Sequence, residues 1–137
     1  MYAKEHGYDQ TFEAYVAGGL AELVQSFNPN KDRIWLAETK TRIIGSVAIV
    51  GHSRTSAQLR WFLVHPEYRR LGIGKQLLKE AVRFCKECKY KTVFLWTTDE
   101  LTAAGRLYIR FRFIKTEEKK HKIWGKELTE EKYELRM

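Results

Sequence analysis

The amino-acid sequence predicts an α/β fold in which a mixed β-sheet is flanked by helices. Segments whose apolar residues recur at helical spacing alternate with short runs rich in β-branched and aromatic residues. Between Leu59 and Leu78 a strand-like run, a glycine-containing turn and the start of a helix follow one another directly. The chain has 137 residues, of which 44% are hydrophobic and 13% aromatic. This size suits one domain with its own core, and we expect that domain to comprise residues 1–137.

The first helix is expected after a short polar segment, Met1 to Tyr8, with Thr11 as its N-cap. Two adjacent glycines, Gly18 and Gly19, weaken this helix and predict close packing or a kink at that point. The helix is expected to end at residues 28–30, Asn-Pro-Asn. Its apolar face comprises Phe12, Tyr15, Val16, Leu20, Leu23, Val24 and Phe27.

Two runs of strand-forming residues, Arg33 to Glu38 and Ile43 to Val50, follow the first helix. They predict a β-hairpin whose turn lies at residues 39–42. Gly45 lies inside the second run. A glycine within a strand often marks a bulge or the close approach of another element, and we expect one of these here.

The later elements continue the alternation of strands and helices. A polar loop, Gly51 to Ser56, leads to the strand Leu59 to Val64. Helical spacing of apolar residues predicts a helix from Gly74 to about Lys89, and Lys91 to Thr97 is a strongly apolar strand. The remaining predicted elements are a helix at Leu101 to Arg110, a strand beginning at Phe111 to Ile114, and strand material at Ile123-Trp124 and Tyr133 to Met137.

The formal net charge of +8 suits nucleic acid, an anionic membrane surface or a polyanionic cofactor. The excess lies partly in the turn at residues 69–75 and partly in Lys115 to Lys126, where lysines alternate with glutamates and indicate a solvated face. No nucleic-acid-binding motif accompanies the charge, so nucleic acid is not an expected partner. No apolar run has membrane-spanning length, and the N-terminus lacks an apolar signal core. We expect a cytoplasmic protein without membrane contacts.

The two cysteines, Cys85 and Cys88, fall inside the second predicted helix. A zinc site would need more ligands than one Cys pair, and no second pair or nearby His pair supplies them. Reduced, at least partly buried thiols are favoured over a redox role, and no metal is expected.

The turn between the strand and the second helix has the features of a phosphate site. Gly72 and Gly74 allow the backbone to approach a ligand closely and to adopt positive φ. The first N–H groups of the helix lack intrahelical partners and carry partial positive charge. Leu77 stands where the dinucleotide fingerprint requires a third glycine, and no Gly-Lys-Ser/Thr follows, which excludes the nucleoside-triphosphate loop. A phosphate or pyrophosphate compound is the expected ligand; a turn that binds nothing is the alternative.

Residues 64–78 read Val-His-Pro-Glu-Tyr-Arg-Arg-Leu-Gly-Ile-Gly-Lys-Gln-Leu-Leu and contain Arg69-x-x-Gly72-x-Gly74. This resembles the acyl-CoA-binding motif of the GNAT superfamily of N-acetyltransferases, Gln/Arg-x-x-Gly-x-Gly/Ala. Residues 101–113 resemble a second family segment, although Leu101 and Arg112 stand where the family has Asn and Gly. An arginine disfavours the positive φ that a glycine permits. Residues 95–104 and 117–130 look like the subgroup found fused behind MarR-type regulators.

The resemblance implies a GNAT-like mixed sheet, here without the strand that members usually carry before the first helix. It implies that acetyl-CoA lies in a V between the strands Leu59–Val64 and Lys91–Thr97, and that a bulge near Leu63 lets them part. Strand backbone would hold the pantetheine arm and turn amides the pyrophosphate. The expected cofactor-binding residues are Phe62, Leu63, Val64, Arg69, Arg70, Leu71, Gly72, Ile73, Gly74 and Lys75.

By the same resemblance, Tyr108 is the expected general acid for the departing thiolate; a ring that only packs in the core is the alternative. The general base stays open. Gln58 stands near the place where some members have Glu and cannot serve. The other candidates are His52, His65 and Glu100.

The implied reaction is direct transfer of an acetyl group to a primary amine, either a small molecule or a peptide. The amine is expected across the V from the cofactor, near residues 7–9 and 121–124, with Trp35, Trp61 and Trp96 as possible lining. A sheet edge without its usual first strand also suggests a homodimer. The alternative function is a catalytically weak acyl-CoA-binding, sensing or partner-binding module with the same fold.

Overall fold

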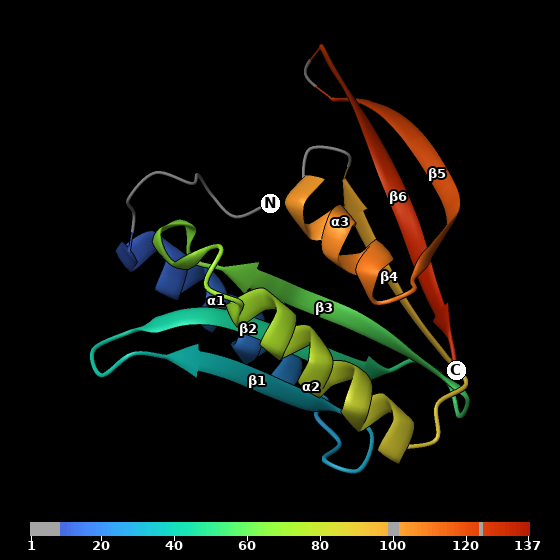
Figure 1. The fold of residues 1–137 in the computed structure, drawn as a ribbon, viewed down its shortest axis with the longest axis horizontal. Helices are drawn as coiled ribbons and strands as arrows, with labels where there is room; N and C mark the ends of the chain where they lie inside the picture. The colour runs from blue at the N-terminus through green and yellow to red at the C-terminus, as the bar shows by residue number, and fades with distance from the viewer. Residues whose placement is uncertain (1–8, 99–101, 124) are drawn as a thin grey trace.

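The computed structural model describes residues 9–98, 102–123 and 125–137 (Figure 1). None of the helices in these ranges is both long and apolar enough to span a lipid bilayer. The elements are α1 (Asp9–Val24), β1 (Arg33–Glu38), β2 (Ile43–Gly51), β3 (Ser56–Val64), a 3-10 turn (Pro66–Tyr68), α2 (Ile73–Glu87), β4 (Thr92–Thr98), α3 (Thr102–Arg110), β5 (Ile114–Ile123) and β6 (Lys126–Arg136).

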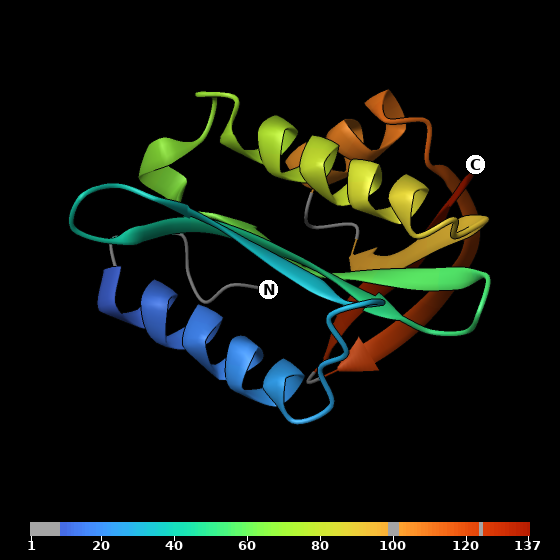
Figure 2. The same cartoon turned by 90° about the horizontal axis from the view of Figure 1, so that it is seen from below.

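A six-stranded mixed sheet with the order β1-β2-β3-β4-β6-β5 forms the centre of the molecule. Only β3 and β4 run parallel, and every other neighbouring pair is antiparallel. The helices α2 and α3 cover one face and α1 covers the other (Figure 2). The main core lies under α2, where fully buried side chains from the helix meet those of the central strands. They include Val47, Ile49, Ala57, Leu78, Ala81, Val93 and Leu95.

The parallel pair β3 and β4 is short. It joins Ser56–Gln58 to Thr92–Phe94, and no further pairing between the two strands follows. Beyond this point β3 stays paired with β2 as far as Val64, and β4 stays paired with β6 as far as Thr98. The two strands therefore part toward their C-terminal ends, as the sequence predicts.

A bulge in β3 accompanies the parting. Ser46 of β2 pairs with Leu63 and Ala48 pairs with Arg60, so β3 contains one residue more than its partner over this stretch. Trp61 has φ of +53°, and the buried Ser46 hydroxyl donates a 2.7 Å hydrogen bond to its carbonyl oxygen. After the bulge, Phe62 packs toward the α2 side and Leu63 toward α1. The bulge predicted near Leu63 is thus found at Trp61 and Phe62.

Gly45 shows both features that its place in a strand predicts. A Cβ added there would lie 3.1 Å from a methyl carbon of Leu77 and 3.2 Å from the Leu63 carbonyl oxygen, so α2 and β3 both approach closely. The pairing of β1 with β2 also shifts by one residue between Ala37 and Glu38, opposite Gly45.

The helix α1 packs against the bulge through a glycine. A Cβ added to Gly19 would lie 2.6 Å from the indole ring of Trp61, whereas one added to Gly18 would have nothing within 4 Å. Close packing is therefore confirmed at Gly19. The predicted N-cap is wrong, because the helix already begins at Asp9 and Thr11 lies inside it. The position before Asp9 lies outside the described residues.

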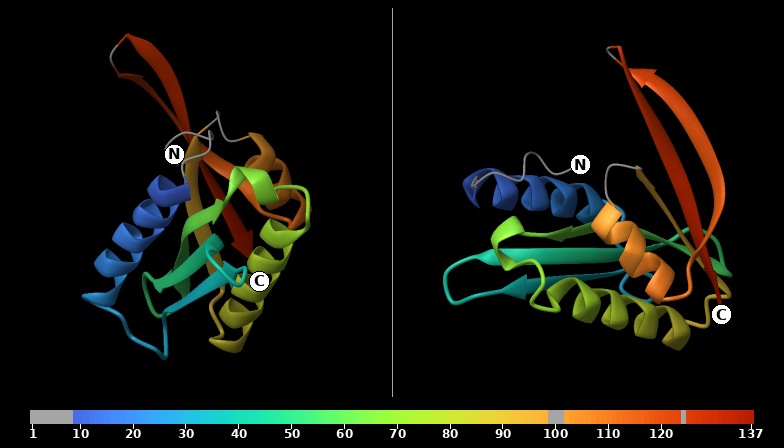
Figure 3. Two further views of the ribbon diagram at one scale, coloured as in Figure 1. Left: turned by 90° about the vertical axis from the view of Figure 1, so that its left-hand side faces the viewer. Right: turned by 45° about the horizontal axis from the view of Figure 1, so that its top comes forward.

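The strand β5 begins at Ile114, where the sequence predicts a strand to start, but its charged middle is the largest departure from the predicted elements. Within Lys115 to Lys126, interpreted as a solvated face, residues 115–120 are exposed as expected, but they belong to the edge strand β5. Charged side chains on both faces of β5 hide the alternation that normally reveals a strand, and such charges protect an edge from unwanted pairing. The β5–β6 hairpin extends past the other strands (Figures 1 and 3).

The other predicted boundaries differ by a few residues. The loop predicted over Gly51 to Ser56 is shorter, because Gly51 still belongs to β2 and Ser56 already belongs to β3. The opposite edge of the sheet is β1, and within the described residues no strand precedes α1. The homodimer expected to cover this edge stays a prediction.

The contact between Gly19 and Trp61 predicts opposite effects for two neighbouring substitutions. Gly19→Ala forces a methyl group into the indole ring and should lower the free energy of unfolding by about 1 to 3 kcal/mol. Gly18→Ala, its matched control, should raise it by about 0.5 to 1 kcal/mol, because alanine favours a helix and the space is open. Urea unfolding of both variants measures the difference. Equal stabilities would show that α1 does not rest on Trp61.

Candidate active site

The turn between β3 and α2 presents backbone N–H groups to solvent. Arg70 has φ of +68° and Gly72 has φ of +80°, and such left-handed residues let neighbouring N–H groups converge on an anion. Gly72 is the N-cap of α2 and offers no side chain to the helix, and the first turn of α2 contains no acidic residue. The first N–H groups of α2 therefore have no side-chain acceptor from the helix itself, and a bound anion would satisfy them.

Three elements converge at Gly74, in the first turn of α2. A Cβ added there would lie 3.3 Å from the ring of Phe62, 3.5 Å from a methyl of Val64 and 3.5 Å from a methyl of Leu107. This glycine thus lets β3, α2 and α3 meet, which places predicted residues from the strand and from the turn at one point. Leu63 turns its side chain to the opposite face, so any contribution it makes on this side comes from its backbone.

A groove runs from the first turn of α2 along α3. Its lining residues are Lys75, Leu107, Arg110 and Phe111. Of these, only Lys75 was among the residues expected to bind a cofactor. The other three recur at helical spacing, i, i+3 and i+4, and so share one face of α3 and its C-terminal turn. That spacing is visible in the sequence, although only the structure shows which neighbour the face meets.

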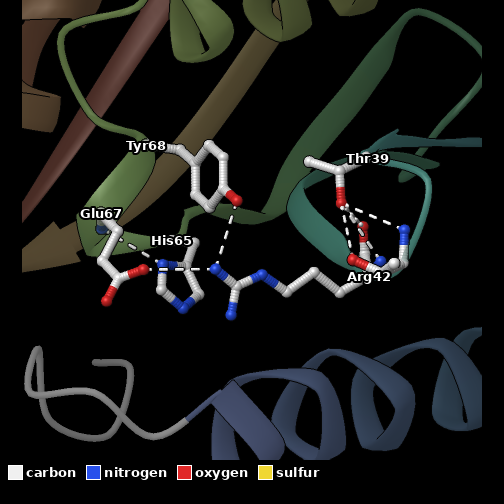
Figure 4. A network of polar contacts seen from close by, with 6 residues as sticks. Thr39, Arg42, His65, Glu67 and Tyr68 are labelled. Atoms are coloured by element: carbon white, nitrogen blue, oxygen red, sulfur yellow. Dashed lines mark hydrogen bonds and ion pairs between the residues drawn. The ribbon is translucent and has the colours of Figure 1, made fainter.

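An arginine from the β1–β2 hairpin holds the segment before the turn (Figure 4). Arg42 Nη2 donates hydrogen bonds of 3.2 Å to Glu67 Oε2 and of 3.2 Å to the Tyr68 hydroxyl, and its guanidinium lies 5.3 Å from the centre of the Tyr68 ring. His65 lies at the start of the same segment and is 1% exposed. Its side-chain Nδ1 accepts a 3.1 Å hydrogen bond from the backbone N–H of Glu67. The backbone N–H of His65 donates to the Ile44 carbonyl oxygen at 2.7 Å. His65 is therefore engaged as a cap, which argues against its role as a base.

Tyr108 lies in an aromatic cluster at the base of the V. Its ring is 4% exposed and has its centre 5.8 Å from those of Phe62, Phe113 and Tyr133. Phe62 belongs to β3, and Tyr133 belongs to β6 opposite Leu95 of β4. Burial, with a smaller contribution from Tyr133, raises the pKa of Tyr108 above its ordinary value. The hydroxyl is consequently a stable proton carrier at neutral pH.

The helix α3 ends in a left-handed turn, although Arg112 stands where the family has glycine. Arg112 adopts φ of +72°, its N–H donates to Ile109 O at 2.9 Å, and the Phe113 N–H donates to Tyr108 O at 3.0 Å. This is the usual glycine-type helix ending, formed here by an arginine. The arginine strains the turn by about 1 to 2 kcal/mol but does not prevent it.

The remaining candidates separate by location. His52 lies in the β2–β3 loop with its ring centre 5.1 Å from that of Phe94, at the closed end of the V. Trp35 packs on Phe84 of α2 and Trp61 on α1, so both belong to packed layers. Trp96 lies beside β6, with Lys119 Nζ 4.7 Å from the centre of its indole ring. The positions Gly7, Tyr8, Glu100, Leu101 and Trp124 lie outside the described residues.

The family model described as "Acetyltransferase (GNAT) family" matches residues 2–113, which is most of the chain. The chain belongs to this family. Among GNAT relatives, an N-acetyltransferase of Schizosaccharomyces pombe, described as uncharacterized, is 30% identical over 118 residues, covering 85% of this chain and 72% of its own. N-acetyltransferase family 8 member 3 of Rattus norvegicus is 33% identical over 89 residues, covering 61% of this chain but only 39% of its own length.

Comparison with solved structures confirms the GNAT fold. An acetyltransferase of Salmonella typhimurium, solved with its cofactor acetyl-CoA, superposes with a TM-score of 0.76 at 15% identity, over 99% of this chain and 91% of its own. The mixed sheet flanked by helices is therefore the predicted one. The likeness to the subgroup fused to MarR-type regulators stays a prediction.

The Arg42 contacts predict a loss of stability when this side chain is removed. Arg42→Ala should lower the free energy of unfolding by about 1 to 2 kcal/mol, because two charge-assisted hydrogen bonds and a ring contact disappear from a largely buried guanidinium. Arg83, whose contact with Glu80 is an exposed i,i+3 pair, provides the control. Arg83→Ala should change stability by less than about 0.5 kcal/mol. Denaturant unfolding of both variants tests this, and equal losses would contradict it.

Proposed function

We propose that this protein is an acetyl-CoA-dependent N-acetyltransferase that transfers an acetyl group directly to a primary amine. The observation that carries the proposal is the parting of β3 from β4 immediately before the turn Arg69 to Gly74. Along the chain, the open edge of β3 is followed by the turn and then by the first N–H groups of α2. A peptide-like arm that ends in a pyrophosphate requires this arrangement. We treat residues 1–137 as one acetyltransferase domain located in the cytoplasm.

The residues at the turn fit the cofactor that the Salmonella structure contains. The backbone from Arg70 to Lys75 would hold the pyrophosphate, with Lys75 and Arg110 placing two cations along the adjoining groove. The backbone of residues 62–64 would hold the pantetheine arm. Bound acetyl-CoA supplies an acetyl group activated as a thioester.

The side chains present support direct transfer. Burial, with Cys88 nearby, raises the pKa of the Cys85 thiol to about 12, so this thiol does not ionise at neutral pH and is a poor nucleophile. Cys88 lies at the opposite end of α2 from the turn, with its Sγ 3.6 Å from Asn30 O. Neither cysteine is placed to carry the acetyl group. We assign the departing sulfur's proton to the Tyr108 hydroxyl.

A second candidate function is favoured by the burial of Tyr108. A ring enclosed by Phe62, Phe113 and Tyr133 also suits a protein that binds acyl-CoA without turnover. The two functions are separated by measuring thiol release over a panel of a polyamine, an amino sugar, an amino acid and a peptide with a free N-terminus. Acyl-CoA binding with no thiol release above the hydrolysis background would favour the binding module.

The turn predicts which glycine matters for the cofactor. CoA should raise the melting temperature of the wild-type protein, because it binds only the native state. Gly72→Glu should abolish this shift, since it places a carboxylate against the pyrophosphate. Gly125 in the β5–β6 turn has a similar φ of +74° and equally open surroundings, so Gly125→Glu is a matched control with the same strain. The CoA shift should survive there. An unchanged shift in Gly72→Glu would place the cofactor elsewhere.

Tyr108→Phe tests the proposed proton donor. The substitution keeps the ring in its cluster and removes its only exchangeable proton, so kcat should fall by about 10²–10⁴-fold while CoA affinity and melting temperature change little. Single-turnover rates should be measured alongside kcat, because a slow product-release step would hide the effect. Wild-type single-turnover rates in this variant would remove Tyr108 from the mechanism.

A further inference from the structure

The segment between β3 and α2 contributes little to the hydrophobic core. It runs from His65 to Gly72, and only His65 is buried. The 3-10 turn Pro66–Tyr68 within it has no buried residue, and Leu71 is 68% exposed. A segment with so little apolar burial is easily displaced, so its polar contacts decide how well it is ordered.

The backbone hydrogen bonds of this segment fix its shape more than its position. The Tyr68 N–H donates to His65 O at 2.9 Å, and the Arg69 N–H donates to Pro66 O at 3.5 Å, so both bonds stay within the turn. The bond from the His65 N–H to Ile44 O ties the beginning of the segment to β2. Its end is continuous with α2. The middle of the segment needs another anchor.

Arg42 supplies a contact to that middle part from the β1–β2 hairpin. Its backbone is fixed in the hairpin turn, because the Thr39 N–H donates to Arg42 O at 2.8 Å and the Arg42 N–H donates to Thr39 Oγ1 at 3.2 Å (Figure 4). The side chain is only 21% exposed, and Nη2 is shared between Glu67 and the Tyr68 hydroxyl. One guanidinium thus joins two consecutive residues of the segment to a neighbouring hairpin.

The residues that Arg42 holds come directly before the backbone N–H groups that face solvent. Arg70 and Gly72 adopt positive φ shortly after Tyr68, and the N–H groups converge only while these angles are kept. When a binding-competent conformation is only partly populated, the apparent affinity falls in proportion to its population. A side chain that orders Tyr68 can therefore strengthen anion binding without touching the anion.

Resting on the proposed function, we propose that Arg42 is a positioning residue for the cofactor, which keeps the turn in the conformation that receives the pyrophosphate. Its charge is already paired with Glu67, so it acts by ordering the segment rather than by attracting the phosphates. The coupling is reciprocal, because CoA that favours the ordered turn also favours the contact between Arg42 and Tyr68.

The test measures the dissociation constant of CoA by calorimetry, at a temperature where circular dichroism shows every variant folded. Arg42→Ala should raise this constant about 10-fold. The KM for acetyl-CoA should rise in parallel, while kcat at saturating acetyl-CoA and the KM for the accepted amine of the panel stay unchanged. Arg42→Lys can keep one of the two contacts and should lose less. Tyr68→Phe should also weaken CoA binding, and adding it to Arg42→Ala should cause little further loss.

Lys40 supplies the matched control, because it lies in the same hairpin turn, is exposed and carries the same charge. No residue in the described ranges forms an ion pair with it. Lys40→Ala should keep the wild-type affinity for CoA. Equal weakening in Lys40→Ala and Arg42→Ala would overturn the proposal in favour of long-range attraction.

Two further results would also overturn it. Wild-type CoA affinity in Arg42→Ala, with only a lower stability, would leave Arg42 a structural residue. Full recovery of CoA affinity when Glu67→Gln is added to Arg42→Ala would mean that Arg42 only neutralises that carboxylate. A wild-type protein that binds no CoA would instead refute the proposed function itself.

Discussion

The site depends on the early end of the hydrogen bonding between β3 and β4. The two strands pair only from Ser56 to Gln58 and from Thr92 to Phe94, and each then continues with a different neighbour. Their facing edges carry backbone donors and acceptors that no strand satisfies, which in a folded interior is costly. An extended ligand with amide groups can satisfy both edges as an added strand would. The same feature that weakens the sheet thus leaves an edge at which such a ligand could pair.

Packing on both faces keeps the strands apart. On one face, Trp61 of β3 has a positive φ and turns its indole ring toward α1, where Gly19 leaves space for it. On the other face Phe62 turns toward Tyr108, and Gly74 lets α2 approach the strand. The bulge is what sends these two consecutive aromatic side chains to opposite faces. Small residues at two helix positions therefore fix the shape of a site built largely from backbone.

Much of the fold and of the turn before α2 was predictable, because the sequence signals for them are local. The periodicity of α2 and the glycines of the turn are encoded within a few residues, and so are the strands Arg33–Glu38 and Thr92–Thr98. The start of β5 was predicted near Ile114, but its charged middle escaped detection because lysines and glutamates occupy both of its faces, so its conformation is imposed by pairing with β6. Arg112 keeps a left-handed turn against its own preference, because two backbone hydrogen bonds and the burial of Phe113 outweigh the strain.

The contact between His121 and Glu130 shows a further limit of local information. The two residues are on different strands, and only the register that pairs Lys119 with Glu130 brings them within reach of each other. The register also brings the pair beside Thr98, where β4 ends. A sequence can thus reveal the turn at residues 69–75, whose parts are contiguous, and leave a contact of this kind unseen, because it is assembled across strands.

The compensation of positive charge differs between the β5–β6 hairpin and the groove beside α2. On the hairpin, Lys115 and Lys132 form ion pairs with glutamates, so the charges of these two lysines are compensated. Around the groove, Lys75 and Arg110 have no carboxylate within ion-pair distance among the described residues. Part of the net charge of +8 is therefore left uncompensated beside the first turn of α2. Uncompensated cations at a helix N-terminus raise the local concentration of a polyanion, so this part of the surface favours an anionic ligand.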